Sequence, residues 1–177
     1  MCIRDSQFLT PYFELYIHDS HLPTPVIEKF NIANSTLDEV TDVDILVLCV
    51  PVQFLEDTLI KIKDKLKKDT IVLDVSSVKI KPIELMLKHL PEDVSILGTH
   101  PLFGPQSGSK GIIGLNMVLC PVRINKLRFR YIKRFLKDEL ELNLLDRTAD
   151  VHDKQMAYVQ ALTHFIGRAV NEMDIPD

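Results

Sequence analysis

The amino-acid sequence predicts an α/β protein built on an open, doubly wound, mostly parallel sheet. Short apolar runs typical of buried strands alternate along the chain with segments whose apolar residues recur at helical spacing. A repeated strand–helix–strand order requires right-handed crossovers, which place helices on the faces of one sheet. From residue 148 the pattern changes to a single long helix. We therefore expect a sheet domain over residues 1–147 and the first helix of a second domain over residues 148–177.

The first expected strand, Phe13–His18, mixes aromatic and β-branched residues and ends at Asp19. In a dinucleotide-binding sheet, a carboxylate at this strand end binds the ribose 2′-hydroxyl and repels a 2′-phosphate. Asp19 is therefore a candidate cofactor residue, and it favours NAD over NADP. The alternative is a turn residue, because aspartates are common at strand ends.

The next expected strand is the near-continuous apolar run Asp44–Val50, which Pro51 halts. Such runs are typical of parallel strands that are covered on both faces, so Cys49 is expected to be buried. Val50, Pro51 and Val52 form a second candidate site of cofactor contact, at the end of this strand. A proline that merely ends a buried strand is the alternative.

Helices and strands then alternate to the end of the chain. The expected elements are a helix start at Ser35–Val40, a helix carrying Leu55, Leu59, Ile62 and Leu66, a strand at Thr70–Val75, a helix at Ile80–Leu90, strands at Val94–Leu97 and Asn116–Cys120, a helix at Lys126–Glu141, a strand at Leu142–Leu145 and a long helix from Thr148. Pro82 is compatible with the first turn of its helix, where its missing N–H costs nothing.

Composition excludes several classes of function. The net charge is −4, and the densest basic run, Lys61–Lys68, reads as a solvated helix face, so nucleic acid is not an expected partner. No apolar stretch approaches the roughly 20 residues of a membrane span, and no export signal opens the chain. The three cysteines are widely spaced and form no metal-binding pair. A cytoplasmic protein without a metal site is expected.

No glycine precedes Gly98, although a dinucleotide-binding domain normally opens with a glycine-rich turn that cradles the pyrophosphate. We therefore expect the phosphate-binding loop to be absent. The opening residues contain no buried strand, and the last three, Ile175–Asp177, follow directly on one helix. Both ends are expected to be cut, and the chain alone is expected to be inactive.

Three motifs resemble one family. Gly98–Gly108 (GTHPLFGPQSG) is very similar to the His-Pro-Met-Phe-Gly-Pro-acid-Ser-Gly signature of the prephenate and arogenate dehydrogenases, the TyrA family. Asp74–Lys79 (DVSSVK) resembles its Ser-Val-Lys motif, and His152–Phe165 (HDKQMAYVQALTHF) resembles the motif that opens its helical domain. The resemblance covers about residues 13–175. It implies a Rossmann-like domain, a helical dimerisation domain, a homodimer, and NAD-dependent oxidative decarboxylation of a small-molecule substrate.

His100 is the candidate catalytic residue. It follows a short strand, in a turn flanked by glycines, at the sheet edge where open α/β folds bind ligands. Oxidising an alcohol requires its proton to leave as hydride departs, and an imidazole with an ordinary pKa of about 6.5 can accept a hydrogen bond from that hydroxyl at neutral pH. The alternative is a solvent-exposed loop histidine.

The resemblance assigns Ser77 a hydrogen bond to the catalytic histidine, which would fix the orientation of its ring. Ser76 is placed with the residues that bind the cofactor. The alternative is that both serines cap the helix beginning near Ile80, a common role for serine. Lys79 is interpreted as a surface lysine without a chemical role.

Gln160 and His164 lie four residues apart, on one face of the long helix. The resemblance implies that they contact the substrate, whereas ordinary exposure is the alternative for Gln160. His152 lies about 120° away from His164 around that helix, which excludes a helical metal pair. His152 and Asp153 are assigned to the helix start, where an acid suits the helix dipole.

Gln106 stands where relatives commonly carry an acid. The amide keeps the hydrogen-bonding shape but loses the charge, which favours prephenate over arogenate, whose ammonium an acid would bind. The predicted product is 4-hydroxyphenylpyruvate. The alternatives are an arogenate dehydrogenase that gives tyrosine directly, another hydroxy-acid dehydrogenase, and a non-catalytic ligand-binding domain. Hydroxy-acid dehydrogenases typically rely on a lysine in the helical domain, and Lys154 is the only lysine after residue 148.

Overall fold

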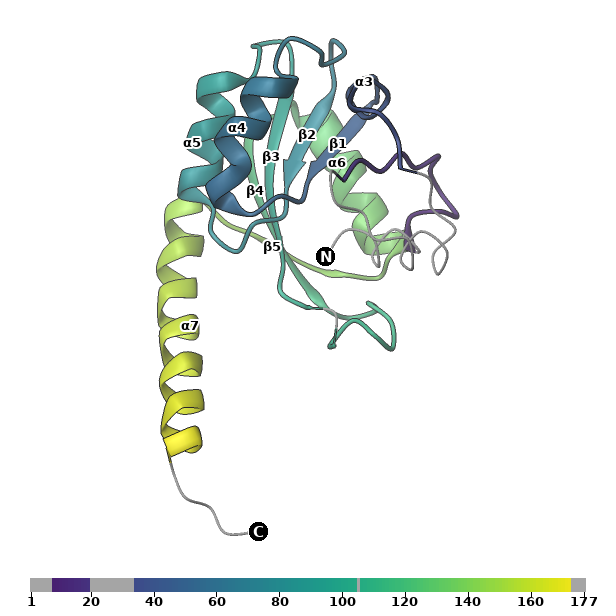
Figure 1. Cartoon of the computed structure of the whole chain (residues 1–177). Helices are drawn as coiled ribbons and strands as arrows, with labels where there is room; N and C mark the ends of the chain where they lie inside the picture. Colours follow the sequence, from purple (N-terminus) through teal and green to yellow (C-terminus); the bar gives the residue numbers. More distant parts are fainter. Residues whose placement is uncertain (1–7, 20–33, 105, 173–177) are drawn as a thin grey trace.

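The computed structural model describes residues 8–19, 34–104 and 106–172, and it confirms the α/β fold (Figure 1). One five-stranded sheet in the order β1-β2-β3-β4-β5 forms its centre. The strands are β1 (Ile45–Leu48), β2 (Ile71–Asp74), β3 (Ser95–Pro101), β4 (Asn116–Arg123) and β5 (Asn143–Asp146). The helices are α3 (Leu37–Thr41), α4 (Val52–Ile62), α5 (Ile80–His89), α6 (Lys126–Arg134) and α7 (Ala149–Glu172), with the π-helical turn η2 (Phe135–Glu139) after α6.

The sheet is mostly parallel, as predicted. β1, β2 and β3 run parallel, β4 runs antiparallel to β3, and β5 runs parallel to β4. The crossovers between the first three strands are the helices α4 and α5. No helix of the described residues lies between β3 and β4, and a connection without a crossover returns the chain antiparallel.

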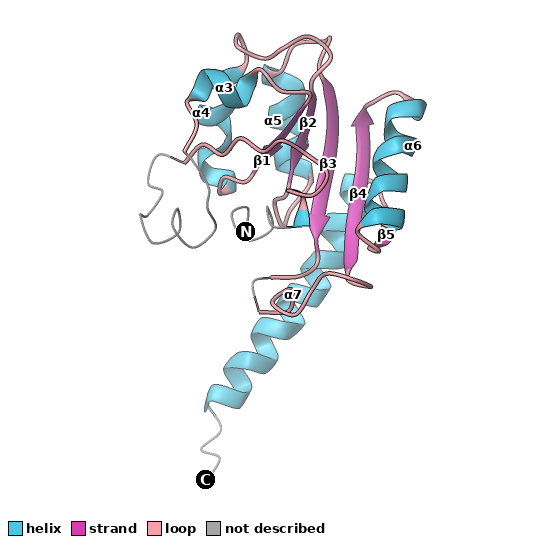
Figure 2. Cartoon of the chain, turned by 90° about the vertical axis from the view of Figure 1, so that its right-hand side faces the viewer, coloured by secondary structure: helices cyan, strands magenta, loops and turns pink. Residues whose placement is uncertain are grey.

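Helices cover the two faces of the sheet. α4 and α5 lie on one side and α6 on the other (Figures 1 and 2). Alternate residues of β4 point to opposite faces: Val118 and Cys120 join the core under α4 and α5, whereas Met117 and Leu119 join the core beside η2. The sheet therefore separates two hydrophobic cores.

Two expectations about the start of the sheet are wrong. β1 is a strand, but Ile45 and Val47 are 39% and 41% exposed and Cys49 is also exposed. β1 is an edge strand of the described sheet, and its residues Leu46 and Leu48 pack in the core that contains Leu55 and Leu59 of α4. Among the described residues Phe13–His18 forms no strand of the sheet, and Ile17 makes an isolated bridge with Asn34. A local pattern of aromatic and β-branched residues forms a stable strand only where another strand pairs with it.

The predicted helix signals are mostly confirmed. Thr36 caps α3 and exchanges hydrogen bonds with Glu39 in a capping box. Leu55, Leu59 and Ile62 form the buried face of α4. The helix expected over Lys126–Glu141 instead ends as α6 at Arg134 and continues as η2.

The long helix α7 begins at Ala149, with the Thr148 hydroxyl accepting the Val151 N–H at 3.4 Å. Its first turns contact α5, and the rest extends away from the sheet domain (Figure 1). That extended part exposes large apolar side chains at Tyr158, Val159, Leu162, Phe165 and Ile166. None of the described helices is both long and apolar enough to cross a membrane.

Candidate active site

Three predicted site residues lie at one edge of the sheet. Leu48, Asp74 and Gly98 are in register across the parallel strands β1, β2 and β3. Two residues beyond them come Val50, Ser76 and His100. These positions therefore lie at the carboxyl ends of β1, β2 and β3. Open α/β sheets bind their ligands at this edge.

His100 is held by the sheet itself. It lies within β3, opposite Val118 of β4, and not in the turn that the sequence suggests. Its neighbour Gly98 lies in a tight space, where a Cβ atom would be 3.0 Å from Ile83 Cδ1 and 3.3 Å from Cys120 Cβ. The small residue lets α5 and β4 approach the strand that positions His100. β3 is therefore packed closely against α5 and β4 at Gly98, two residues before the candidate catalytic residue.

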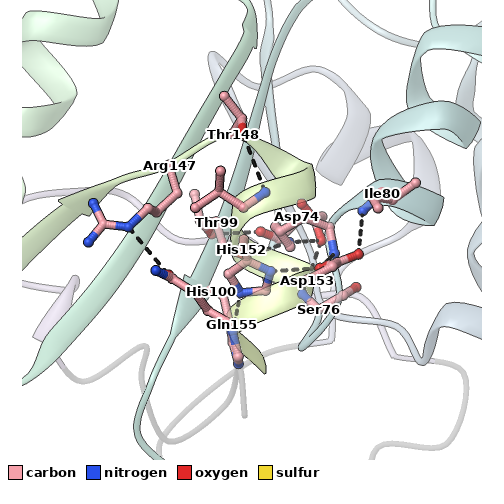
Figure 3. Close-up of polar contacts among 12 residues, drawn as sticks. Asp74, Ser76, Ile80, Thr99, His100, Arg147, Thr148, His152, Asp153 and Gln155 are labelled. Atoms are coloured by element: carbon pink, nitrogen blue, oxygen red, sulfur yellow. Dashed lines mark hydrogen bonds and ion pairs between the residues drawn. The ribbon is translucent and has the colours of Figure 1, made fainter. Parts of the chain in front are cut away.

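A chain of hydrogen bonds leads from His100 into the protein (Figure 3). His100 Nδ1 lies 2.9 Å from His152 Nε2, and His152 Nδ1 lies 2.7 Å from Asp153 Oδ1. The two imidazole rings meet edge to face, and His152 is 1% exposed. The sequence predicts His152 only as a helix-start residue. Helical spacing relates it to residues of its own helix and does not reveal this contact with β3.

Asp153 also ties α7 to the sheet domain. Its Oδ1 accepts the Lys79 N–H at 2.7 Å and its Oδ2 accepts the Ile80 N–H at 2.9 Å, so it caps the N-terminus of α5 (Figure 3). Neither Ser76 nor Ser77 caps this helix. Burial raises the pKa of the Asp153 carboxyl, but the hydrogen bonds from Ile80, His152 and Lys79 outweigh it and leave the pKa below its usual value.

Lys79 is fully buried, so its interpretation as a surface lysine is wrong. Its ammonium forms an ion pair with the equally buried Asp74 carboxylate and donates to the Thr99 carbonyl at 2.6 Å. The Thr99 hydroxyl in turn donates to the Asp74 carbonyl at 2.6 Å. Burial lowers the pKa of Lys79, and the Asp74 carboxylate opposes that shift. These contacts join the ends of β2 and β3 directly beside His100.

The surroundings of His100 keep its imidazole neutral. Burial is the largest cause, followed by the nearby His152 and Lys79, while Asp153 opposes them; together they lower the pKa of His100 from 6.5 to about 4. At neutral pH the ring can therefore accept a proton. A neutral imidazole is the form that a proton acceptor requires.

This shift predicts a loss of stability on acidification. Between pH 6.5 and about 4 the unfolded chain binds a proton at His100 that the folded chain does not. The free energy of unfolding contributed by this group therefore decreases as the pH falls through that window. We expect His100→Gln to flatten this part of a urea-unfolding profile. Equal slopes in the parent and His100→Gln would contradict the assignment.

No described contact joins the other predicted site residues to His100. Ser77 is exposed, and no hydrogen bond in the described ranges joins it to His100, whose Nδ1 faces His152 instead. Asp19 is exposed, and its backbone exchanges hydrogen bonds with the Asn34 side chain, outside the sheet. Gln106 is exposed in the turn after β3, where its carbonyl accepts the Ser109 hydroxyl at 2.6 Å.

Gln160 and His164 belong to α7, and their side chains lie outside the described part of the structure. At a rise of about 1.5 Å per residue, these positions lie about 12 Å and about 18 Å beyond His152 along the helix. Figure 1 shows this part of α7 extending away from the sheet. The roles predicted for both residues stay predictions.

Comparison with known proteins identifies the family. Residues 27–140 match the family model described as "Prephenate dehydrogenase, nucleotide-binding domain". The chain belongs to the prephenate dehydrogenase family. The match includes Asp74, Lys79 and His100, but it ends before His152 and begins after Asp19.

The relatives to which this chain is similar include proteins named for arogenate alone and for arogenate and prephenate together. Arogenate dehydrogenase 1, chloroplastic, from Arabidopsis thaliana is 35% identical over 141 residues, which cover 75% of this chain and 22% of that protein. The probable arogenate/prephenate dehydrogenase of Methanocaldococcus jannaschii is 27% identical over 148 residues, which cover 80% and 32%. The chain thus spans a third or less of the length of these two relatives.

The fold agrees with that of solved structures. Prephenate dehydrogenase from A. aeolicus, in complex with hydroxyphenyl propionate and NAD+, superposes with a TM-score of 0.73 at 19% identity, covering 96% of this chain and 64% of that one. This likeness confirms the Rossmann-like sheet. The family is one of dehydrogenases with a nucleotide-binding domain.

Proposed function

We propose that the whole enzyme oxidises and decarboxylates prephenate to 4-hydroxyphenylpyruvate, with NAD as the hydride acceptor. The observation that carries this proposal is a neutral His100 at the ligand-binding edge of the sheet, with its Nδ1 occupied by His152. Its Nε2 is then the nitrogen available to a substrate hydroxyl. The family membership limits the expected substrates to prephenate and arogenate.

In this proposal His100 accepts one proton from the substrate and later returns it. It accepts the proton of the ring hydroxyl as hydride leaves the carbon that carries this group. The carbonyl formed there takes up the electron pair released when the ring carboxylate departs as CO2, and the ring becomes aromatic. The proton then returns to the same oxygen, so the overall reaction releases none. Because aromatisation drives the reaction, the protein mainly orients the substrate and holds the proton at Nε2.

The residues at the sheet edge suit a nicotinamide cofactor. NAD, when bound, supplies the hydride acceptor. Val50 and Pro51 lie between β1 and α4, and the N–H of Ser76 is fixed by the Asp74 carboxylate at 3.1 Å. We assign Val50, Pro51, Val52 and Ser76 to the cofactor. Asp19 is assigned to its ribose, which favours NAD over NADP.

Prephenate is preferred over arogenate in this proposal because of Gln106. This side chain is exposed at the ligand edge and has no charge with which to pair an ammonium group. Gln160 and His164 complete the proposed substrate contacts, and Ser77 is assigned with His100 to catalysis. Arogenate is the second candidate, because the relative at 35% identity is named an arogenate dehydrogenase.

The substrate proposal is tested with a full-length family member that carries Gln106 and the three motifs. We expect kcat/KM for prephenate with NAD to exceed that for arogenate, and Gln106→Glu to shift the ratio toward arogenate by about 10-fold, the effect of one charge-assisted hydrogen bond. Gln53→Glu, on α4, is the control for added charge. A parent enzyme that prefers arogenate would overturn the choice of substrate.

We further propose that the whole enzyme is a homodimer. The extended part of α7 carries apolar side chains that are 51–80% exposed, including Tyr158, Leu162, Phe165 and Ile166. A helix with so much exposed apolar surface is stabilised by packing against other helices. This surface is the structural support for the proposed dimer.

A further inference from the structure

The hydrogen bonds of the His152 imidazole restrict the positions of the protons. An ionised carboxylate only accepts hydrogen bonds, so at 2.7 Å from Asp153 Oδ1 the His152 Nδ1 must carry a proton. A bare nitrogen at that distance would place two lone pairs against each other. The low pKa of Asp153 keeps this acceptor ionised at neutral pH.

The second nitrogen of His152 then determines the state of His100. A neutral imidazole has one N–H, so His152 with a proton on Nδ1 presents a lone pair at Nε2. His100 Nδ1, 2.9 Å away, is therefore the donor and carries a proton. A neutral His152 adds no charge to a side chain that is 1% exposed, whereas a doubly protonated His152 would reverse this bond. The remaining nitrogen of a neutral His100, Nε2, is left without a proton.

We propose that His152 and Asp153 are positioning residues that hold neutral His100 in its Nδ1-protonated tautomer, leaving Nε2 as the proton acceptor. The inference rests on the proposed role of His100 in proton transfer. When Nε2 takes up the substrate proton, His100 becomes an imidazolium whose Nδ1–H still points to His152. The Asp153 carboxylate then stabilises the positive charge through His152.

The arrangement depends on the contact of α7 with α5. Asp153 is held in one orientation because the N–H groups of Lys79 and Ile80 occupy its two oxygens. A helix N-terminus stabilises this negative charge. The start of α7 thus supplies both groups that set the tautomer of a residue on β3. A role in packing alone would require burial of His152 but no particular proton arrangement.

The proton positions can be measured on the 177-residue chain by long-range ¹H–¹⁵N correlation spectra of ¹⁵N-histidine-labelled protein at neutral pH. Loss of single signals in His100→Gln and His152→Gln assigns the two residues. We expect both histidines to show the neutral pattern with the proton on Nδ1. An Nε2-protonated His100, or a His152 imidazolium, would overturn the proposal. The tautomers are read from the unaltered chain, and the two variants serve to assign its signals.

Substitution of Asp153 tests its role separately. In Asp153→Asn the amide no longer requires His152 Nδ1 to be a donor, so we expect the Nδ1-protonated form of His100 to lose at least half of its population. Asp150→Asn is the matched control, because Asp150 is an exposed acid in the first turn of α7, three residues before Asp153. An unchanged His100 spectrum in Asp153→Asn would contradict the role of Asp153.

The consequence for catalysis is measured in a full-length family member. We expect Asp153→Asn to lower kcat by about 10- to 100-fold, the usual effect of changing a group that orients a functional side chain, with little change in KM. An unchanged kcat, or a loss confined to KM, would contradict the positioning role. If the tautomer is wrong but His100 variants still lose turnover, this inference fails and the proposed function stands.

Discussion

Replacement of His100 by asparagine in a full-length family member is expected to lower kcat by about 10²- to 10⁴-fold, the range typical of a lost general acid–base residue. Asparagine can still hydrogen-bond a substrate hydroxyl but cannot take its proton. KM should therefore change much less than kcat. The measurement is initial-rate formation of NADH with prephenate as substrate.

A second histidine serves as the control for this experiment. His89 lies in the last turn of α5, where its Nε2 lies 2.9 Å from Glu56 Oε1 of α4. His89→Asn removes an imidazole from the protein without touching the sheet edge, and its kcat should stay within a factor of two of the parent. Near-normal turnover in His100→Asn would remove His100 from the chemistry.

Replacement of Lys79 by methionine is expected to reduce the free energy of unfolding by about 3–5 kcal/mol. The substitution fills a similar volume but leaves the Asp74 carboxylate buried without its counter-ion and removes the donor to the Thr99 carbonyl. Asp74 Oδ1 already lacks a hydrogen-bond partner among the described residues, so little else can compensate for the charge. Urea unfolding of the 177-residue chain measures the effect.

A surface ion pair provides the matched control. Lys65 pairs with Asp38, but their side chains are 43% and 77% exposed, so Lys65→Met should cost no more than about 1 kcal/mol. The double variant Lys79→Met, Asp74→Leu should recover part of the lost stability, because it removes both buried charges together. Equal losses for Lys79→Met and Lys65→Met would show that the buried pair does not stabilise the fold.

The sequence predicted the elements that are defined by apolar runs. β2, β3 and β4 and the helices α4 and α5 follow from apolar content and spacing, because each buries residues in one of the two cores. The strand expected at Phe13–His18 and the double coverage expected for β1 are wrong for one reason. A local pattern shows which residues prefer burial, but it does not show which partner covers them.

The candidate site was predicted only in part. His100 was found from its motif, whereas Lys79 and His152 were not, because their importance depends on contacts between distant segments. The charge of Lys79 favours exposure, because charged side chains are mostly exposed. A signal was present: Asp74 ends a buried strand five residues earlier, and an acid there requires a partner. His152 contacts β3 across an interface that helical periodicity alone cannot reveal.

The measurement that tests the central claim most directly is the pH dependence of kcat/KM for prephenate in the parent enzyme and in His100→Asn. A neutral His100 is required before substrate binds, and burial lowers its pKa to about 4. We therefore expect the parent to lose activity on the acid side with a single protonation below pH 6.5. His100→Asn should be slow and lack this acid limb. An acid limb of the same position and slope in both enzymes would contradict proton acceptance by His100.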